Sequence, residues 1–270
     1  MKVCTLLLVV LATAAPMGAS EMHRPGSKHA QVAPLGPKIH VLLEKDAPSA
    51  LVEAKGSYRV IRTDTSKNLS FGTMGKRFVM QAMQHGLRWG EEYPDVYQIA
   101  IIPTSRSTRL SVNGIQYKGV ISVYHTKGNR IAIINEVPIE DYLKSTLAVK
   151  YDNADLSEEA MAALAIMERT EAYNKALVRT SRPWDVVARE AGYFGSGAAQ
   201  LKNVETSVNS TRYMVLESLK EGGTIQNPHF PVARAQALAQ KGMDAQKILK
   251  SVFPSAKIGA TISADEVAIR

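Results

Sequence analysis

The chain has 270 residues, of which 45% are hydrophobic, 21% charged and 6% aromatic. This composition is typical of a globular protein, and the length suffices for one large domain or two small ones. The 33 basic and 25 acidic residues give a formal net charge of +8, which favours a polyanionic partner but also fits a solvated surface. Nucleic acid is the weaker candidate, because few aromatic side chains are present to stack on bases.

The first twenty residues predict a secretory signal peptide. Lys2 precedes an apolar run over residues 3–15, and the small residues Gly18 and Ser20 suit a signal peptidase. We therefore expect cleavage near Ser20 and export across the inner membrane to the periplasm or cell envelope. The apolar run is shorter than the roughly 20 residues of a spanning helix, and no later segment reaches that length, so no membrane span is expected in the mature protein.

Cysteine and histidine usage argues against a metal site or another cofactor. Cys4 is the only cysteine and lies inside the predicted signal peptide, so we expect no disulfide, thiolate zinc site or cysteine nucleophile in the mature protein. The six histidines lack a metal-ligand spacing such as His-x3-His; they are His23, His29, His40, His85, His125 and His229. We expect no cofactor and a fold stabilised by an apolar core.

The predicted fold class is α+β, with a β-rich half before a helical half. Residues 21–38 are rich in proline and glycine and predict a flexible leader. The predicted domain at residues 39–260 is β-rich over 39–135 and mainly helical over 136–260, and a tail follows at 261–270.

Short apolar runs alternate with turn signals in the first half of this domain, which is typical of β-strands. The predicted strands are residues 39–43, 50–54, 58–61, 96–102, 110–112, 117–124 and 131–134. Asn113-Gly114 predicts a two-residue type I′ hairpin turn, because both residues accept a positive φ. Lys127-Gly128-Asn129 predicts a second hairpin.

The second half begins with a predicted helix from Pro138, whose fixed φ suits a first helical turn, towards Leu147. Ser157 is the predicted N-cap of a long helix that reaches about Leu177. Residues 160–167 of this helix are apolar on every face, which predicts a buried helix with neighbours on all sides. Later helices are predicted at residues 201–211, 232–241 and 244–252, and a further hairpin is suggested for residues 213–217 with 223–225.

Four segments carry motifs of a known family in the same order. They are Val-Asn-Gly and Tyr-Lys-Gly within residues 112–119, Asn-Glu-Val-Pro-Ile-Glu-Asp-Tyr-Leu at 135–143, an Ala-rich segment ending in Met-Glu-Arg-Thr-Glu-Ala at 159–172, and a helix pair at 235–254. Together they resemble the stage II sporulation protein D and amidase-enhancer family, whose members bind peptidoglycan and whose best-known enzymes are lytic transglycosylases.

The resemblance implies an exported cell-wall protein that binds peptidoglycan glycan strands during septal or cell-wall remodelling. Three classes stay open: a lytic transglycosylase that cleaves the strands, a non-catalytic binder that enhances a cell-wall amidase, and a structural envelope protein without the groove. The positive net charge suits the free carboxylates of stem peptides. Some family members bind zinc, but their Gly-His-Gly-x-Gly-Met-Ser-Gln motif is lost at residues 225–234.

The resemblance places the catalytic acid of the family enzymes at position 150, which is Lys150 in this chain. The family glutamate belongs to a Ser-Glu-Met-Pro motif, and no glutamate lies between Tyr142 and Ser157 here. A lytic transglycosylase needs a carboxylic acid to protonate the glycosidic oxygen, and an ammonium group is a poor acid near neutral pH. Two substitutes are candidate catalytic residues: Asp152, which also suits a turn, and Glu168, which also suits a salt bridge to a lysine or arginine.

Candidates for substrate contact lie in the same segments. Lys150 is either a surface lysine or a cation that contacts substrate carboxylates, and Tyr151 adjoins it. Arg169 matches the arginine that ends the family's Ala-rich helix, where its guanidinium either clamps a carboxylate or N-acetyl group of the glycan or packs against a carboxylate of this chain. Glu168 lies on a helix without a solvent-facing stripe, so we expect it to be buried.

Overall fold

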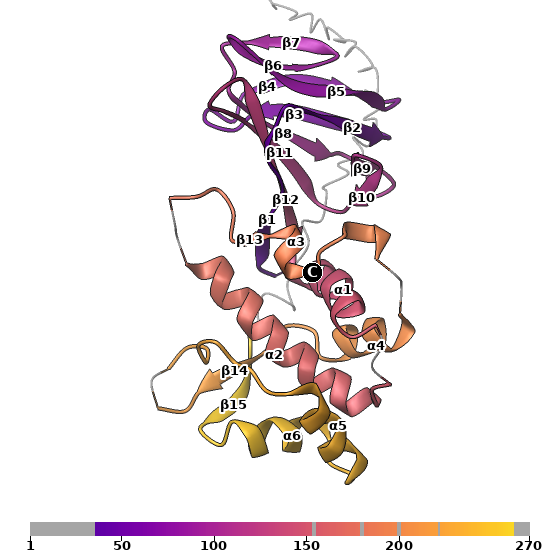
Figure 1. Ribbon diagram of the computed structural model, residues 1–270, viewed down its shortest axis with the longest axis vertical. Helices are drawn as coiled ribbons and strands as arrows, with labels where there is room; N and C mark the ends of the chain where they lie inside the picture. Colours follow the sequence, from indigo (N-terminus) through magenta and orange to yellow (C-terminus); the bar gives the residue numbers. More distant parts are fainter. Residues whose placement is uncertain (1–35, 153–154, 179–180, 199–200, 221, 262–270) are drawn as a thin grey trace, which may run out of the picture. The chain divides into compact units, whose positions relative to one another are not determined.

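The computed structural model describes residues 36–152, 155–178, 181–198, 201–220 and 222–261. Strands dominate the first half and helices the second, so the predicted α+β class is confirmed (Figure 1). The predicted signal peptide, nearly all of the predicted leader and nearly all of the predicted tail lie outside the described residues. Within the described ranges, no helix combines the length and the apolar character needed to cross a membrane.

Seven strands form the first sheet. In spatial order they are β13 (Val186–Val187), β1 (Lys38–Ala47), β12 (Arg130–Pro138), β11 (Val120–Thr126), β8 (Gln98–Pro103), β3 (Tyr58–Arg62) and β4 (Asn68–Gly72). All neighbours pair antiparallel except β1 and β13, which are parallel. The long pairing of β1 with β12 ties the start of the described chain to the strand that leads into the helical half.

Six strands form the second sheet, in the spatial order β10 (Ile115–Tyr117), β9 (Arg109–Val112), β2 (Ser49–Lys55), β5 (Lys76–Met83), β6 (Gly86–Trp89) and β7 (Glu91–Pro94). The sequence analysis did not predict β4, β5, β6 or β7. In β5 only Met80 is buried, so the alternation of a recognisable strand is missing. Its pairing with β2 holds it in the sheet, and tertiary context of this kind overrides local preference.

The strand predicted at residues 117–124 is confirmed over 120–124, which belong to β11, but its start is wrong because Tyr117 belongs to a strand of the other sheet. β10 ends at Tyr117 and β11 begins at Val120. Between them Gly119 adopts a φ of +83°, and a Cβ there would lie 2.0 Å from the carbonyl oxygen of Glu136. Only glycine fits this turn, so Gly119 redirects the chain from one sheet to the other.

Both predicted hairpin turns are confirmed. Asn113 and Gly114 have φ values of +49° and +86° and join β9 to β10, as a type I′ turn requires. Between β11 and β12, Gly128 and Asn129 also have positive φ. These turns set the register of the adjacent strands.

The two sheets share one apolar core. Trp89 is fully buried, its indole N–H donates to the carbonyl oxygen of Val52 at 3.0 Å, and its ring meets Tyr58 edge-on at 5.3 Å. Aliphatic side chains from both sheets complete the core, among them Met80, Leu87, Ile99, Ile101, Ile121 and Ile133. Burial of this apolar surface is the main contribution to the stability of the β-rich half.

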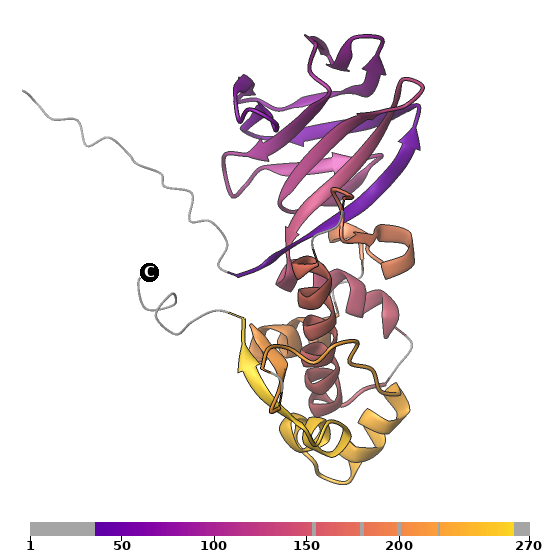
Figure 2. The ribbon, with the colours of Figure 1, turned by 90° about the vertical axis from the view of Figure 1, so that its left-hand side faces the viewer.

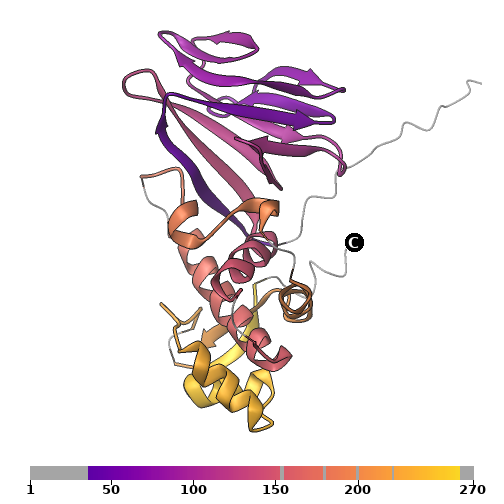
Figure 3. The same cartoon turned by 45° about the vertical axis from the view of Figure 1, so that its right-hand side comes forward.

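Helices α1 (Ile139–Lys150) and α2 (Glu158–Leu177) pack against each other in the helical half (Figure 3). Ser157 caps α2 as predicted, because its hydroxyl oxygen accepts from the N–H of Ala160 at 3.4 Å. Every side chain from Ala160 to Met167 is buried. The prediction of a central helix with neighbours on all sides is therefore confirmed.

Shorter elements pack around α2 (Figure 2). Helices α4 (Lys202–Ser210), α5 (Val232–Gln240) and α6 (Ala245–Val252) lie close to their predicted bounds, whereas α3 (Ala188–Ala191) and the 3-10 turn η1 (Gly195–Gly197) were not predicted.

The hairpin suggested for residues 213–217 with 223–225 is reduced to one bridge, between Glu217 and Thr224. β14 (Met214–Ser218) pairs instead with β15 (Ala256–Ala260) over five residue pairs. The suggested hairpin is thus present only as this short bridge, while the longer pairing is with a strand about forty residues away, which spacing along the sequence does not reveal.

Candidate functional site

Three of the predicted site residues meet where α1 ends. Lys150, the last residue of α1, pairs through its ammonium group with Oε1 of Glu168 on α2. The hydroxyl of Tyr151, the residue that follows α1, donates to the same oxygen at 2.9 Å. The side chain of Lys150 is 48% exposed and that of Glu168 is 17% exposed, so the pair reaches the surface. We call these three residues the Lys150 cluster.

Geometry limits the Lys150 cluster as an acid. A general acid must present a proton to the oxygen that it protonates, yet Oε1 of Glu168 already accepts from two donors. Burial first, and then the charge of Glu168, raise the pKa of the Tyr151 phenol, and burial likewise raises the pKa of Tyr142 beside the same carboxylate. Both phenols therefore stay protonated at neutral pH, and the Tyr151 hydroxyl acts as a hydrogen-bond donor. The salt-bridge interpretation of Glu168 is the one that the structure bears out.

Arg169 lies one residue further along α2 but faces the interior. Its Nε and Nη2 donate to the two carboxylate oxygens of Glu140 at 2.9 Å each. The remaining donors bond within the chain as well, to Val208 O, Met214 O and Thr211 Oγ1 at 3.1, 3.2 and 3.4 Å. Arg169 is fully buried, so packing against a carboxylate of this chain is favoured over contact with a glycan.

Asp152 lies just after α1 and does not join the Lys150 cluster. It is exposed and lines a cavity of about 430 Å³ together with Val149 and Phe194. Within the described ranges no bond links it to Glu168. Asp152 and Glu168 therefore lie on separate surfaces. Their assignment as catalytic residues remains a prediction.

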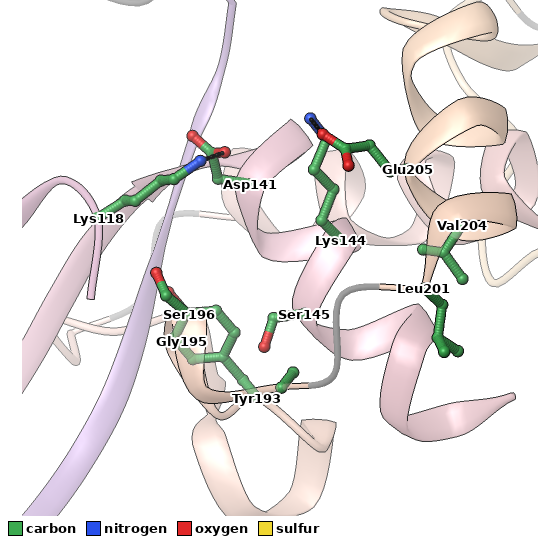
Figure 4. Close-up of a pocket in the computed structure, with 11 residues that line it drawn as sticks. Lys118, Asp141, Lys144, Ser145, Tyr193, Gly195, Ser196, Leu201, Val204 and Glu205 are labelled. Carbon is green, nitrogen blue, oxygen red and sulfur yellow. Dashed lines mark hydrogen bonds and ion pairs between the residues drawn. The ribbon is translucent and has the colours of Figure 1, made fainter. Parts of the chain in front are cut away.

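A second cavity, of about 120 Å³, lies along the same face of α1, nearer the start of the helix (Figure 4). Two ion pairs line it: Lys118 Nζ lies 2.6 Å from Asp141 Oδ1, and Lys144 Nζ lies 3.8 Å from Glu205 Oε1. The two cavities share Ala198 and flank the segment that contains η1. The resulting surface alternates cations and carboxylates along α1.

The sequence analysis did not single out these four charged residues. Lys118 lies inside the Tyr-Lys-Gly motif and Asp141 inside the segment at 135–143, so the motifs held a signal for both. Lys144 and Glu205 carry no such signal, because only the packing of α4 against α1 brings them together.

Buried contacts fix the wall of the smaller cavity. Tyr193 is 3% exposed, and its hydroxyl donates to Asn135 Oδ1 at 2.7 Å. The N–H of Phe194 donates to Ser145 Oγ of α1 at 3.1 Å. Gly195 has a φ of +56°, and a Cβ there would lie 2.3 Å from Gln116 O. This wall is therefore preorganised, since it cannot shift without breaking buried bonds.

A comparison with known protein families also points to the part of the chain that contains the candidate site. The family model "Stage II sporulation protein" (SpoIID) matches residues 127–217, which include α1, α2 and the Lys150 cluster. An uncharacterized protein of Chlamydia muridarum (strain MoPn / Nigg) is 38% identical over 224 residues, covering 82% of this chain and 77% of that protein. An uncharacterized protein of Chlamydia pneumoniae is 38% identical over 219 residues, covering 80% and 79%. No solved structure matches.

Proposed function

This chain belongs to the SpoIID family of stage II sporulation proteins, and from that premise we propose that it is an exported cell-wall protein that binds peptidoglycan glycan strands. The family supports a role at the cell wall. We further propose that binding proceeds without cleavage by the acid of the family enzymes, because position 150 carries a lysine.

The observation that carries the proposal is the Lys150 cluster. Its ammonium and carboxylate groups contact each other at the position where the resemblance expects a lone acid. A cation and an anion side by side can bind the amide, hydroxyl and carboxylate groups of an amino-sugar chain. Neither group is arranged to release a proton to a glycosidic oxygen.

A second charged surface, on a different face of α1 from Lys150, offers further contacts to the proposed ligand. Lys118 and Lys144 offer cations for the stem-peptide carboxylates, while Asp141 and Glu205 offer acceptors for amide and hydroxyl protons. Each of these ions is at least a quarter exposed in its side chain. Such groups contribute mainly to specificity and to the rate of association.

Sedimentation with purified, insoluble peptidoglycan tests the proposal. We expect the chain from Glu21 onwards to sediment with peptidoglycan, and a Lys118→Ala/Lys150→Ala variant to bind about tenfold more weakly, equivalent to ~1.4 kcal/mol. Lys247→Ala is the matched control, because Lys247 is an exposed, ion-paired lysine on α6. Equal binding by all three proteins, or no binding by the unmodified chain, would overturn the proposal and favour the structural envelope protein.

A lytic transglycosylase is the second candidate function, and one observation favours it. Oε2 of Glu168 has no bonded partner within the described part of the chain, so this oxygen can contact a ligand. Incubation with glycan strands, with and without stem peptides, followed by mass spectrometry for 1,6-anhydro-muramic ends, tests it. Product that disappears in Glu168→Gln but persists in Asp152→Asn would establish Glu168 as the acid; absence of product from the unmodified chain removes this candidate.

A cell-wall amidase is the proposed protein partner of a non-catalytic binder. The direct test adds the purified chain to an amidase digesting peptidoglycan and measures the released stem peptides. Stimulation that is lost in the Lys118→Ala/Lys150→Ala variant supports the enhancer role. An unchanged rate removes it while leaving glycan binding intact.

Export is proposed from the predicted signal peptide. We expect the mature protein in the periplasmic fraction, with an N-terminus at or near Glu21 by mass spectrometry. A protein that keeps Met1 and stays in the cytoplasmic fraction would contradict this part of the proposal.

A further inference from the structure

The connection between β4 and β5 exposes large apolar side chains. Phe71 is 81% and Met74 is 95% exposed, the highest values for large hydrophobic residues within the described ranges, and Phe78 is 51% exposed. The turn depends on Gly75, whose φ is +88° and whose Cβ would lie 2.6 Å from Ala54 O. Nothing in this geometry requires an apolar residue at position 74. Single exposed apolar residues are common, but a group on one turn marks an interaction site.

A polar cluster holds this connection in place. Oε1 of Glu91 accepts from Ser70 Oγ at 2.9 Å and from Lys76 Nζ at 2.8 Å, and the Tyr93 hydroxyl also donates to it. The ammonium group of Lys76 lies 4.6 Å from the ring centre of the buried Trp89. The turn is therefore fixed to the core, so a partner would meet Phe71 and Met74 with little ordering cost.

Two sequence stretches beside the connection lack acidic residues, and Asp64 lies between them. Residues 55–62 and residues 66–79 contain neither aspartate nor glutamate. Each stretch has three cations: Lys55, Arg59 and Arg62 in the first, and Lys67, Lys76 and Arg77 in the second. Three of these cations are ion-paired, Lys55 with Glu53, Arg62 with Asp64 and Lys76 with Glu91. The other three, Arg59, Lys67 and Arg77, have no ion pair within the described ranges.

Two exposed arginines lie beside members of this group in the sheets, although Arg77, which directly precedes Phe78 in β5, points to the opposite face of that strand from Phe78. Arg59 is the cross-strand partner of Phe71. Glu53 stands opposite Arg77 in the sheet, but its carboxylate lies 3.8 Å from Lys55. Neither arginine has an ion-pair partner within the described part of the chain. We name Arg59, Phe71, Met74, Arg77 and Phe78 the β4–β5 corner.

We propose that the β4–β5 corner docks on the surface of an anionic phospholipid bilayer. Phe71 and Met74 enter the headgroup region, while Arg59 and Arg77 contact lipid phosphates. Apolar side chains beside basic ones are the composition that binds such interfaces, with buried apolar area and attraction to anionic lipid acting together. This inference goes beyond glycan binding and does not depend on it.

Charge and shape favour a bilayer over the other occupants of an apolar surface. A second copy of the chain would present the same cations to each other, and like charges in contact oppose association. Met74 lies on the turn, and Phe71 and Phe78 lie in the strands beside it. These protruding side chains suit a soft surface that they can enter. A bilayer next to the cell wall is the anionic surface of that kind available to an exported protein.

Co-sedimentation with lipid vesicles tests the inference. We expect the chain from Glu21 onwards, which lacks the predicted signal peptide, to bind vesicles of phosphatidylglycerol with phosphatidylethanolamine and to bind phosphatidylcholine vesicles weakly. Phe71→Ser/Met74→Ser should bind the anionic vesicles about tenfold more weakly. Arg59→Gln/Arg77→Gln should lose a similar factor and most of the preference for anionic lipid. Leu219→Ser is the matched control, since Leu219 is a 59% exposed apolar residue in the helical half.

A Met74→Trp variant reports insertion at the corner itself. Its added tryptophan emission should shift to the blue on anionic vesicles and be quenched by lipids brominated on their acyl chains, over the background of Trp89 and Trp184. Equal binding to both vesicle types, or binding unchanged in Phe71→Ser/Met74→Ser, overturns the inference. A concentration-dependent dimer that Phe71→Ser/Met74→Ser abolishes would also overturn the inference, because the corner would then bind a second copy of the chain.

The vesicle and peptidoglycan assays separate the two proposals. Phe71→Ser/Met74→Ser should keep its sedimentation with peptidoglycan, and Lys118→Ala/Lys150→Ala should keep its vesicle binding. Loss of peptidoglycan binding in the corner variant, with vesicle binding unchanged, would assign the corner to a wall polymer and reject the bilayer.

Discussion

Two ion pairs link α1 to α2 through neighbouring residues of α2, and they behave as opposites. Arg169 is fully buried, and every one of its nitrogens bonds within the chain. Glu168, the preceding residue, pairs with a lysine that is half exposed. A step of one residue along the helix rotates the side-chain direction by about 100°, which moves it from the interior to the surface.

This difference separates a structural role from a chemical one. The Arg169–Glu140 pair cross-links α1, α2, α4 and β14, so it defines how the helical half assembles. The Lys150 cluster lies within reach of solvent and can exchange its internal contacts for those of a ligand. The charges of these residues do not distinguish the buried pair from the exposed pair, because both pairs consist of ordinary ionic residues in the sequence.

Breaking the buried pair should have the largest effect on stability. Arg169→Met leaves the Glu140 carboxylate buried without its partner, which should lower the free energy of unfolding by about 3–5 kcal/mol. Urea unfolding followed by circular dichroism measures it. Lys175→Met is the control, because Lys175 is a half-exposed lysine of α2 paired with Glu171, and it should cost less than about 1 kcal/mol.

The double variant Glu140→Gln/Arg169→Met sharpens this prediction. It removes both charges, so it should recover part of the loss. A loss below about 1 kcal/mol for Arg169→Met alone would show that the buried pair does not hold the helices together.

Reversing one charge of the exposed pair should have a smaller effect. Lys150→Glu sets two carboxylates against each other and should destabilise the protein by about 1 kcal/mol or less, because solvent screens position 150. Adding Glu168→Lys restores an attractive pair and should return the stability close to that of the unmodified chain. Failure of the swap to recover stability would mean that Tyr151, and not the ion pair, depends on Glu168. Both proteins are compared by urea unfolding.

A third ionic group, at the junction of β1 and β12, gives the smallest expected effect and depends on pH. His40 Nε2 lies 3.7 Å from Glu136, and Nδ1 lies 3.2 Å from Asp185. These carboxylates, Glu136 foremost, raise the pKa of His40 above 6.5, and His40 with Lys38 lowers the pKa of Glu136 from 4.5 to about 2.

The pKa shifts define the pH range of the effect. The stability from His40 is fully present below pH 6.5 and is lost as the pH rises through its folded pKa; that from Glu136 is present above pH 4.5 and is lost towards pH 2. His40→Gln should therefore lower the melting temperature most between these limits and least near about pH 8. His85→Gln, at an exposed histidine, is the control. A deficit that is constant from about pH 5 to about pH 8 would contradict the assignment.

Local chemistry explains which parts of the fold could be predicted. The cap at Ser157, the all-apolar stretch from Ala160 to Met167 and the turn at Asn113-Gly114 each depend on a few adjacent residues, and all three are confirmed. β5 and β15 could not be predicted, because their strand character comes from partners far along the chain.

The same division holds for the candidate site. The sequence by itself determined that a lysine stands at the expected acid position and that Glu168 is a candidate acid on the central helix. Only the tertiary structure decided that these two residues contact each other, that Arg169 turns inward to Glu140, and that Lys144 meets Glu205. The physical reason is that residue types and helix periodicity are local properties, whereas ion-pair partners and burial depend on how separate helices pack.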